Sequence, residues 1–172
     1  MRCIYQIILA GLVLILLSSC SMSQYIKRNN RSTERWACRL CERNGSAFYL
    51  STTYSYISYV WTDKREEIEV RRLVKGKVQK KWTIKGNWII NYDGKALEKA
   101  KNELEERCPF ELDGDLVGYF IRVNGSVYEY SYGISMDCME QNVYDSEILN
   151  GILYVLLNSN YNLWKKNMGE LP

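Results

Sequence analysis

The cysteines are the residues of this chain whose type and spacing could do chemistry. Residues 38–41 form a C-x-x-C motif, and Cys108 and Cys138 follow much later. Such a motif can lower the pKa of one thiol and carry out thiol–disulfide exchange. A redox site of that kind follows a strand in a βαβ pattern, whereas a polar segment precedes this one. We therefore favour structural disulfides over exchange chemistry, involving Cys38, Cys41, Cys108 and Cys138.

Four cysteines allow three pairings, and the sequence alone does not choose among them. We predict a bond between Cys108 and Cys138, which would tie the end of one predicted helix to the loop before the next. Cys38 and Cys41 would then bond each other or cross to that pair. A zinc site is disfavoured, because Cys108 and Cys138 lack a second close spacing.

The chain contains no His. This excludes a Ser-His-Asp or Cys-His arrangement and removes the commonest general base and metal ligand. Carboxylate, Lys, Tyr and Cys chemistry remain formally open. The balance of 23 Lys and Arg against 20 Asp and Glu does not favour nucleic acid as a partner. We predict no catalytic residue, no metal site and no cofactor.

The first twenty residues read as a secretory signal. One positive charge at Arg2 precedes an apolar run over residues 4–17, and Ser18, Ser19 and Cys20 close it. This is the order of a signal peptide. The run is also short for a membrane span, which needs roughly 20 apolar residues.

The segment Leu17-Ser18-Ser19-Cys20 resembles the lipobox of bacterial lipoprotein precursors. The resemblance implies cleavage before Cys20 and attachment of fatty acyl chains, such as palmitate, to that residue. Several acyl chains hold a protein at a membrane far better than one does. Because Ser21 is not aspartate, the resemblance also implies the outer membrane, with the protein facing the periplasm. A conventionally secreted or uncleaved precursor is the alternative.

The remaining chain suits one domain. Residues 1–19 are the predicted signal peptide, and residues 20–35 the lipidated N-terminus and a flexible polar tether. The basic residues of this tether, which we expect to be solvated, could touch anionic lipid head groups. Residues 36–172 form the predicted domain.

Alternating and turn-forming residues predict a largely antiparallel sheet. Residues 47–62 are rich in β-formers, and their apolar parity switches near residue 56, which indicates a bulge or two successive strands. The other predicted strands are 68–74, 77–85 and 88–92, and a hairpin over 116–133 that turns at Asn124-Gly125.

Two amphipathic helices complete the predicted fold. One runs from about Lys95 to Arg107, and the other begins at Asp145 or Ser146 and ends near Leu157. Residues 135–144 between them are expected to form a loop. We predict an α+β fold with a largely antiparallel sheet and two helices packed on one face.

Two surfaces could bind a partner. Three tyrosines share one face of the predicted hairpin strand and could stack on sugar or peptide, although packing against a helix is the commoner use of such a face. Three lysines share one face of the strand over 77–85 and could meet a polyanion, although a solvated face is the commoner meaning. These residues are Tyr128, Tyr130, Tyr132, Lys77, Lys81 and Lys85.

We predict an envelope-anchored lipoprotein that acts as a non-enzymatic binding module, such as an assembly accessory, an inhibitor or an immunity-type protein. Its partners would be the membrane, through the N-terminal lipid, and an envelope protein or glycan. One alternative is a thiol–disulfide oxidoreductase using Cys38 and Cys41. Another is a structural envelope protein whose basic hairpin contacts anionic glycan or lipid.

Overall fold

The computed structural model describes residues 24–53, 56–64, 66–85 and 92–159. The predicted signal peptide, Cys20 and most of the short strand predicted over 88–92 lie outside these residues.

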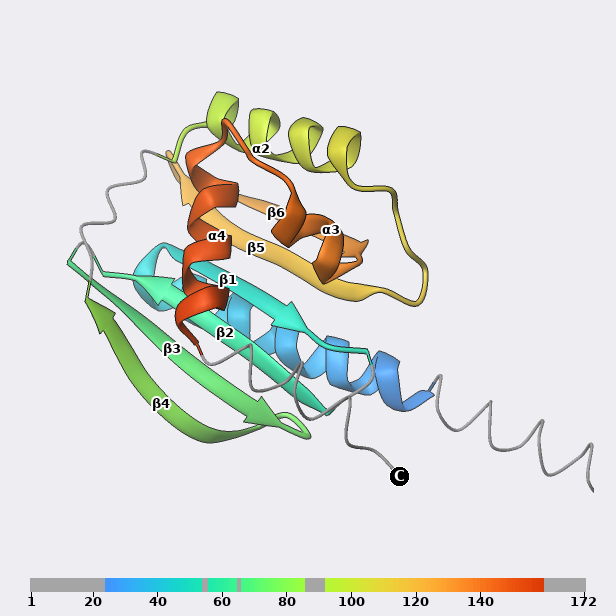
Figure 1. Ribbon diagram of the computed structural model, residues 1–172. Helices are drawn as coiled ribbons and strands as arrows, with labels where there is room; N and C mark the ends of the chain where they lie inside the picture. The colour runs from blue at the N-terminus through green and yellow to red at the C-terminus, as the bar shows by residue number, and fades with distance from the viewer. Residues whose placement is uncertain (1–23, 54–55, 65, 86–91, 160–172) are drawn as a thin grey trace, which may run out of the picture.

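An antiparallel six-stranded sheet forms the centre of the molecule, in the order β4-β3-β2-β1-β5-β6 (Figure 1). The α+β prediction is confirmed, because every strand pair is antiparallel. The run predicted over 47–62 is two strands, so its switch of apolar parity marks a chain reversal. The strands are β1 (Ser46–Ser51), β2 (Ile57–Asp63), β3 (Glu67–Val74), β4 (Lys77–Lys85), β5 (Asp115–Val123) and β6 (Ser126–Ile134).

The two tight hairpins turn where the sequence predicts. Lys75 and Gly76 both have positive φ, as do Asn124 and Gly125. Positive φ at both central residues is the type I′ geometry, which matches the right-handed twist of the flanking strands. These turns join β3 to β4 and β5 to β6, so they fix the pairing at both edges of the sheet.

Helices α2 (Gly94–Arg107) and α4 (Glu147–Asn158) pack on one face of the sheet, as predicted. The predicted apolar stripe of α2, made by Leu97, Ala100 and Leu104, is buried there. Asp93 caps α2 by accepting the Ala96 N–H at 2.7 Å. The predicted loop before α4 contains a short helix instead, α3 (Met136–Gln141), which buries Met136 and Met139.

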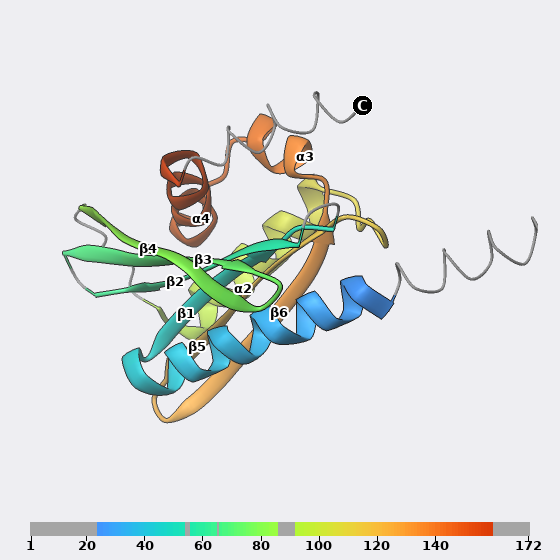
Figure 2. The same ribbon diagram turned by 90° about the horizontal axis from the view of Figure 1, so that it is seen from below.

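The opposite face is covered by a helix over residues 24–44, called the N-terminal helix below (Figure 2). The prediction of a flexible tether is therefore wrong for residues 24–35, which form the first half of this helix. The tether prediction failed because the buried positions of this half are polar. Thr33 Oγ1 donates a hydrogen bond to Ser58 Oγ at 2.8 Å, and Asn29 Nδ2 donates to Ser51 Oγ at 3.0 Å.

The second half of the N-terminal helix packs through apolar side chains. Ala37, Leu40 and Cys41 are buried against β1, β2, β3 and β5. Every residue of β1 is consequently buried, because helices cover both faces of this central strand. The sheet thus has two separate apolar clusters, one on each face.

Candidate binding surface

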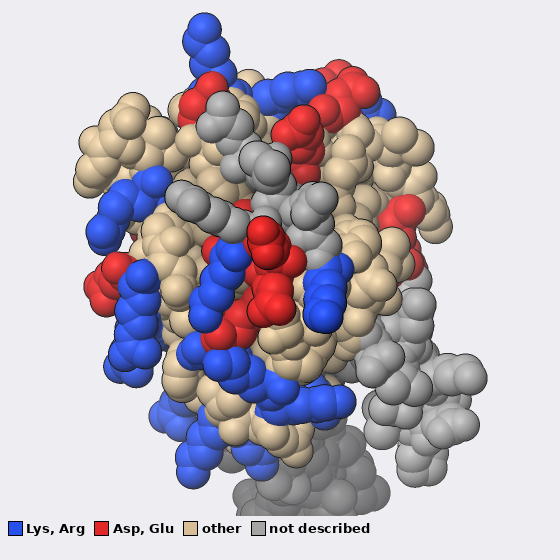
Figure 3. All heavy atoms as spheres, turned by 90° about the vertical axis from the view of Figure 1, so that its left-hand side faces the viewer, with Lys and Arg blue, Asp and Glu red and all other residues tan. Residues whose placement is uncertain are grey.

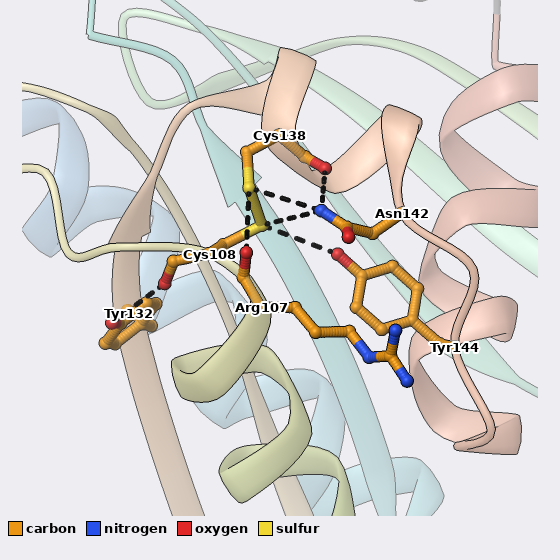
Figure 4. The surroundings of a disulfide bond; sticks show 6 residues. All are labelled: Arg107, Cys108, Tyr132, Cys138, Asn142 and Tyr144. Carbon is orange, nitrogen blue, oxygen red and sulfur yellow. Dashed lines mark hydrogen bonds between the residues drawn. A yellow bond between two sulfur atoms is a disulfide. The ribbon is translucent and has the colours of Figure 1, made fainter.

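The structure pairs Cys108 with Cys138, as predicted (Figure 4). Cys108 is the residue that ends α2, and Cys138 lies in α3. Their Cα atoms are 5.8 Å apart, within the range that a disulfide requires. The bond closes a loop that contains β5 and β6, so it fastens α3 to the end of α2.

Polar groups surround this disulfide and hold the segments that it joins (Figure 4). Asn142 Nδ2 donates to the Cys138 carbonyl at 2.8 Å, and the Tyr132 hydroxyl donates to the Cys108 carbonyl at 3.2 Å. Tyr144 places its hydroxyl 3.6 Å from Cys108 Sγ. Cys108 itself is fully buried. The surroundings are those of a structural cross-link.

Cys38 and Cys41 are free thiols in the structure. The prediction that these two cysteines form disulfides is therefore wrong, both for a mutual bond and for a bond to the other pair. They lie in the N-terminal helix, and Cys41 is buried, with its Sγ 3.6 Å from the Gly45 carbonyl oxygen. Burial raises the pKa of the Cys41 thiol, outweighing the nearby positive charge of Arg122.

The predicted tyrosine face packs mainly against α2. The rings of Tyr130 and Tyr132 stack with centroids 6.0 Å apart, and both side chains lie against the apolar cluster. The Tyr130 hydroxyl donates a hydrogen bond to Glu105 Oε1 at 3.2 Å. The pKa of Tyr130 is raised, mainly by burial and secondly by the negative charge of Glu105. Tyr128 is exposed nearer the turn. Two of the three rings are thus part of the packing between β6 and α2.

The three predicted lysines do not share one face of β4. Lys81 pairs in register with Arg71, and Lys85 pairs with Glu67, so both lie on the face of the N-terminal helix. A register shift between Arg72 and Leu73 then places Lys77 opposite Val74, on the other face. The prediction assumed strict alternation, which a β-bulge breaks.

An ionic cluster forms where β3 and β4 meet the end of β2. Glu69 carries a carboxylate that contacts Lys64 at 2.8 Å, Lys81 at 3.0 Å and the guanidinium of Arg71. The side chain of Glu69 is 9% exposed, whereas those of Lys64 and Lys81 are 47% and 54% exposed. One buried carboxylate thus anchors three cations, two of which reach solvent.

The electrostatics of Glu69 follow from this arrangement. Burial alone would raise the pKa of Glu69, but hydrogen bonds from Lys64, Arg71 and Lys81 outweigh burial and lower the pKa to about 2. The carboxylate is therefore charged at any physiological pH, and it neutralises only one of the three cations.

Trp36 connects this cluster to the N-terminal helix. The guanidinium carbon of Arg71 lies 5.7 Å from the centre of the Trp36 ring, and Trp36 Nε1 donates to the Gly76 carbonyl at 3.1 Å. The helix, the β3–β4 turn and the cluster are thereby fixed relative to one another. We call Lys64, Arg71, Lys81 and Lys85, together with Glu69 and Trp36, the basic surface.

Figure 3 views the molecule from the side on which β2, β3 and β4 reach the surface. Lys and Arg side chains flank a central acidic group on this side and extend below it. An open cleft of about 490 Å³ lies beside the basic surface and shares Lys64 with it. Arg122, Asp63, Tyr92 and Asn44 also line the cleft.

Glu69, Trp36 and the cleft were not predicted from the sequence. Glu69 stands in a strand with a basic second half, and nothing in the alternation shows that its neighbours converge on it. In the sequence, Trp36 is only an aromatic residue near the C-x-x-C motif, and nothing there indicates its contacts with Arg71 and Gly76. The cleft depends on the turn after the N-terminal helix, which the predicted tether did not include.

Within the described ranges, no three His, Cys, Asp or Glu side chains are grouped so that they could hold a metal ion. The described helices include none that is both long and apolar enough to cross a membrane. No protein-family model matches the chain, and no curated protein matches its sequence.

Proposed function

We propose that this protein is a lipid-anchored, non-enzymatic binding module of the bacterial cell envelope, which takes an anionic partner on the basic surface. The observation that supports the proposal best is the cluster at Glu69. Three cations converge on one carboxylate, which leaves positive charge on an exposed and rigid surface. The lipobox-like residues before the domain support attachment at Cys20 and the outer-membrane location.

Rigidity suits the basic surface to recognition. Lys64 and Lys81 are held by Glu69, and Arg71 is held by both Glu69 and Trp36. Side chains that are already ordered lose less entropy when a partner binds. An exposed positive patch also accelerates association with an anionic partner, in a manner that depends on ionic strength.

The thiol–disulfide oxidoreductase remains the second candidate, because Cys38 and Cys41 are free thiols in a C-x-x-C motif. Two features weigh against it. Cys41 is buried with a raised pKa, which disfavours the reactive thiolate. Both cysteines also lie in the last two turns of the helix, where the negative end of the helix dipole opposes thiolate formation.

A cross-linking experiment on intact envelopes tests the proposal. Cells would carry the wild-type protein, a variant with Lys64, Lys81 and Lys85 changed to Gln, or a control with Lys95, Lys99 and Lys101 changed to Gln. Both variants lose three positive charges, but the control loses them from α2. We expect one defined partner adduct with the wild type and the control, and its loss from the first variant.

Two results would contradict the proposed binding module. One is an identical set of adducts for all three proteins when circular dichroism shows each to be folded. The other is catalysis of disulfide exchange by the wild-type protein, with loss of this activity in Cys38→Ser. That result would support the thiol–disulfide oxidoreductase instead.

A further inference from the structure

The outer face of the N-terminal helix carries a line of arginines. Their spacing of three, four, four and four residues keeps them within about one third of the helix circumference. All five are exposed. We call Arg28, Arg31, Arg35, Arg39 and Arg43 the arginine stripe.

The stripe faces away from the sheet. The buried side of the same helix is formed by Asn29, Thr33, Ala37, Leu40 and Cys41. Figure 2 shows the helix as the outermost layer on its side of the sheet, with its far side open. The apolar side chains of the helix are used in packing, so the stripe offers charge rather than an inserting apolar surface.

The stripe arginines lack ion-pair partners among the described residues. The ion pairs found join Lys64, Arg71 and Lys81 to Glu69 and Arg107 to Glu103, and none includes a stripe arginine. The helix also carries two acids, Glu34 and Glu42, three residues after Arg31 and Arg39, but neither forms an ion pair with a stripe arginine. The five arginines therefore outnumber the two acids of the helix and leave net positive charge on its outer face.

The chemistry of the stripe suits phosphate. Five of the six basic residues in this helix are Arg. The planar guanidinium donates paired hydrogen bonds to phosphate oxygens and gives up its water more readily than ammonium does. Regularly placed guanidinium groups along about 22 Å of helix match a surface of lipid phosphates better than they match one small anion.

The charge of the whole chain is divided in the same sense. Residues 24–85 contain 15 Lys and Arg against six Asp and Glu, whereas residues 92–159 contain five against 13. The first range supplies the N-terminal helix, and the second supplies α2, α3 and α4 on the other face of the sheet. An anionic membrane would therefore attract the helix side and repel the other.

We propose that the N-terminal helix lies flat on the anionic lipid surface, with the arginine stripe against the phosphate groups. This inference rests on the proposed lipid anchor at Cys20. The chain from Cys20 to Gln24 spans at most about 14 Å, so the anchor holds the first turn of the helix close to the bilayer. The basic surface, which includes Trp36 on the flank of this helix, would then lie at the edge of the area where the helix contacts the membrane. Helices α2 and α4, on the other face of the sheet, would point away from the membrane.

Arginine footprinting on the lipidated full chain tests this orientation. The purified protein is incorporated into phosphatidylcholine vesicles or vesicles rich in phosphatidylglycerol, and phenylglyoxal modification of each arginine is followed by mass spectrometry. We expect slower modification of Arg31, Arg35 and Arg39 on the anionic vesicles, reversed by high salt. Arg107, at the end of α2, should react equally on both.

A pair of variants separates docking from general charge. Changing Arg28, Arg31 and Arg35 to Gln should weaken docking about a hundredfold, because each basic residue near an anionic surface favours contact about fivefold. Arg39 and Arg43 should then react at the same rate on both kinds of vesicle. The control with Lys95, Lys99 and Lys101 changed to Gln should keep the protection.

The outcomes separate this proposal from the one on which it rests. Equal rates on both vesicles, with the lipid present in the mass spectrum, would overturn the orientation and leave the anchor intact. A chain that lacks the lipid and is not retained on phosphatidylcholine vesicles would overturn both. Protection by a soluble polyanion such as heparin, without protection by anionic vesicles, would replace the membrane by a glycan ligand.

Discussion

At the scale of single residues, two buried carboxylates are pushed in opposite directions by their surroundings. Glu69 lies among three cations, which lower its pKa to about 2 despite burial. Asp115 has no such neighbours, and burial raises its pKa to about 6, although the Thr53 N–H donates to it at 2.9 Å. Stability should therefore respond to pH in opposite ways through these two side chains.

Glu69→Gln should destabilise the fold by about 1–3 kcal/mol at neutral pH, because three cations lose their shared counter-charge. The folded pKa lies below the reference value of 4.5, so the stabilisation is present above that pH and is lost as pH falls toward 2. Urea unfolding at neutral and acid pH would measure this. Glu67→Gln, at an exposed position of β3, is the control. A constant difference between wild type and Glu69→Gln across this range would contradict the account.

Asp115→Asn should have the opposite signature. The folded pKa of about 6 lies above the reference value of 3.8, so ionisation costs stability as pH rises between these values. We expect the variant to match the wild type near the lower value and to be the more stable of the two above about pH 6, in thermal melts followed across this range. Exposed Asp113→Asn should show no such trend. A wild type that gains stability from pH 4 to 7 relative to Asp115→Asn would refute the reasoning.

At the scale of elements, the strands and helices with regular turn or apolar patterns were predicted from the sequence. Asn124-Gly125 set the β5–β6 register, and Leu97, Ala100 and Leu104 marked the buried side of α2. The N-terminal helix could not be found in the same way. Its buried positions include Asn29 and Thr33, which donate hydrogen bonds to hydroxyl groups of β1 and β2. Such polar positions do not appear in a hydrophobic pattern.

The candidate site was predictable only in part. Lys81 and Lys85 were placed correctly on one face, but Lys77 was not, because no residue in β4 announces the register shift. The Cys108–Cys138 bond followed from the positions of the two predicted helices. The free thiols of Cys38 and Cys41 were not predicted. They lie in the N-terminal helix, which was missed because several of its buried residues are polar.

Leu40→Ala tests whether the N-terminal helix belongs to the fold. Leu40 is buried against the sheet, and removing its side chain should cost about 2–4 kcal/mol, measured by chemical unfolding. Arg39→Ala, one residue earlier but exposed, should change stability by less than about 0.5 kcal/mol. If both changes had equally small effects on stability, the helix would not be part of the fold, and the prediction of a flexible tether would be supported.

Removing the disulfide should loosen α3 from α2. The bond joins residues 30 apart, and the loop that it closes predicts a loss of about 3–4 kcal/mol in the double variant Cys108→Ser, Cys138→Ser. Thermal melts with and without reductant would show this: reductant should lower the melting temperature of the wild type and leave the variant unchanged. If reductant lowered the melting temperature of both proteins by a similar amount, its effect would not come from the Cys108–Cys138 bond.

At the scale of the whole molecule, the proposed lipid anchor and two charged surfaces lie on one domain. In our proposal, the lipid at Cys20 would set where the chain resides and the arginine stripe would set how the domain lies on the membrane. The basic surface at the flank of the stripe would meet the partner. Both surfaces depend on the anchor for their local concentration near anionic lipids and envelope components.

The most direct test of this account is the mass of the mature N-terminal peptide from protein isolated out of bacterial membranes. We predict a chain that begins at Cys20 and carries fatty acyl groups on that residue, with residues 1–19 removed. The variant Cys20→Ser should retain residues 1–19 and lack the lipid. A wild-type chain that begins at Met1 or at any residue other than Cys20, or that begins at Cys20 without lipid, would contradict the central claim.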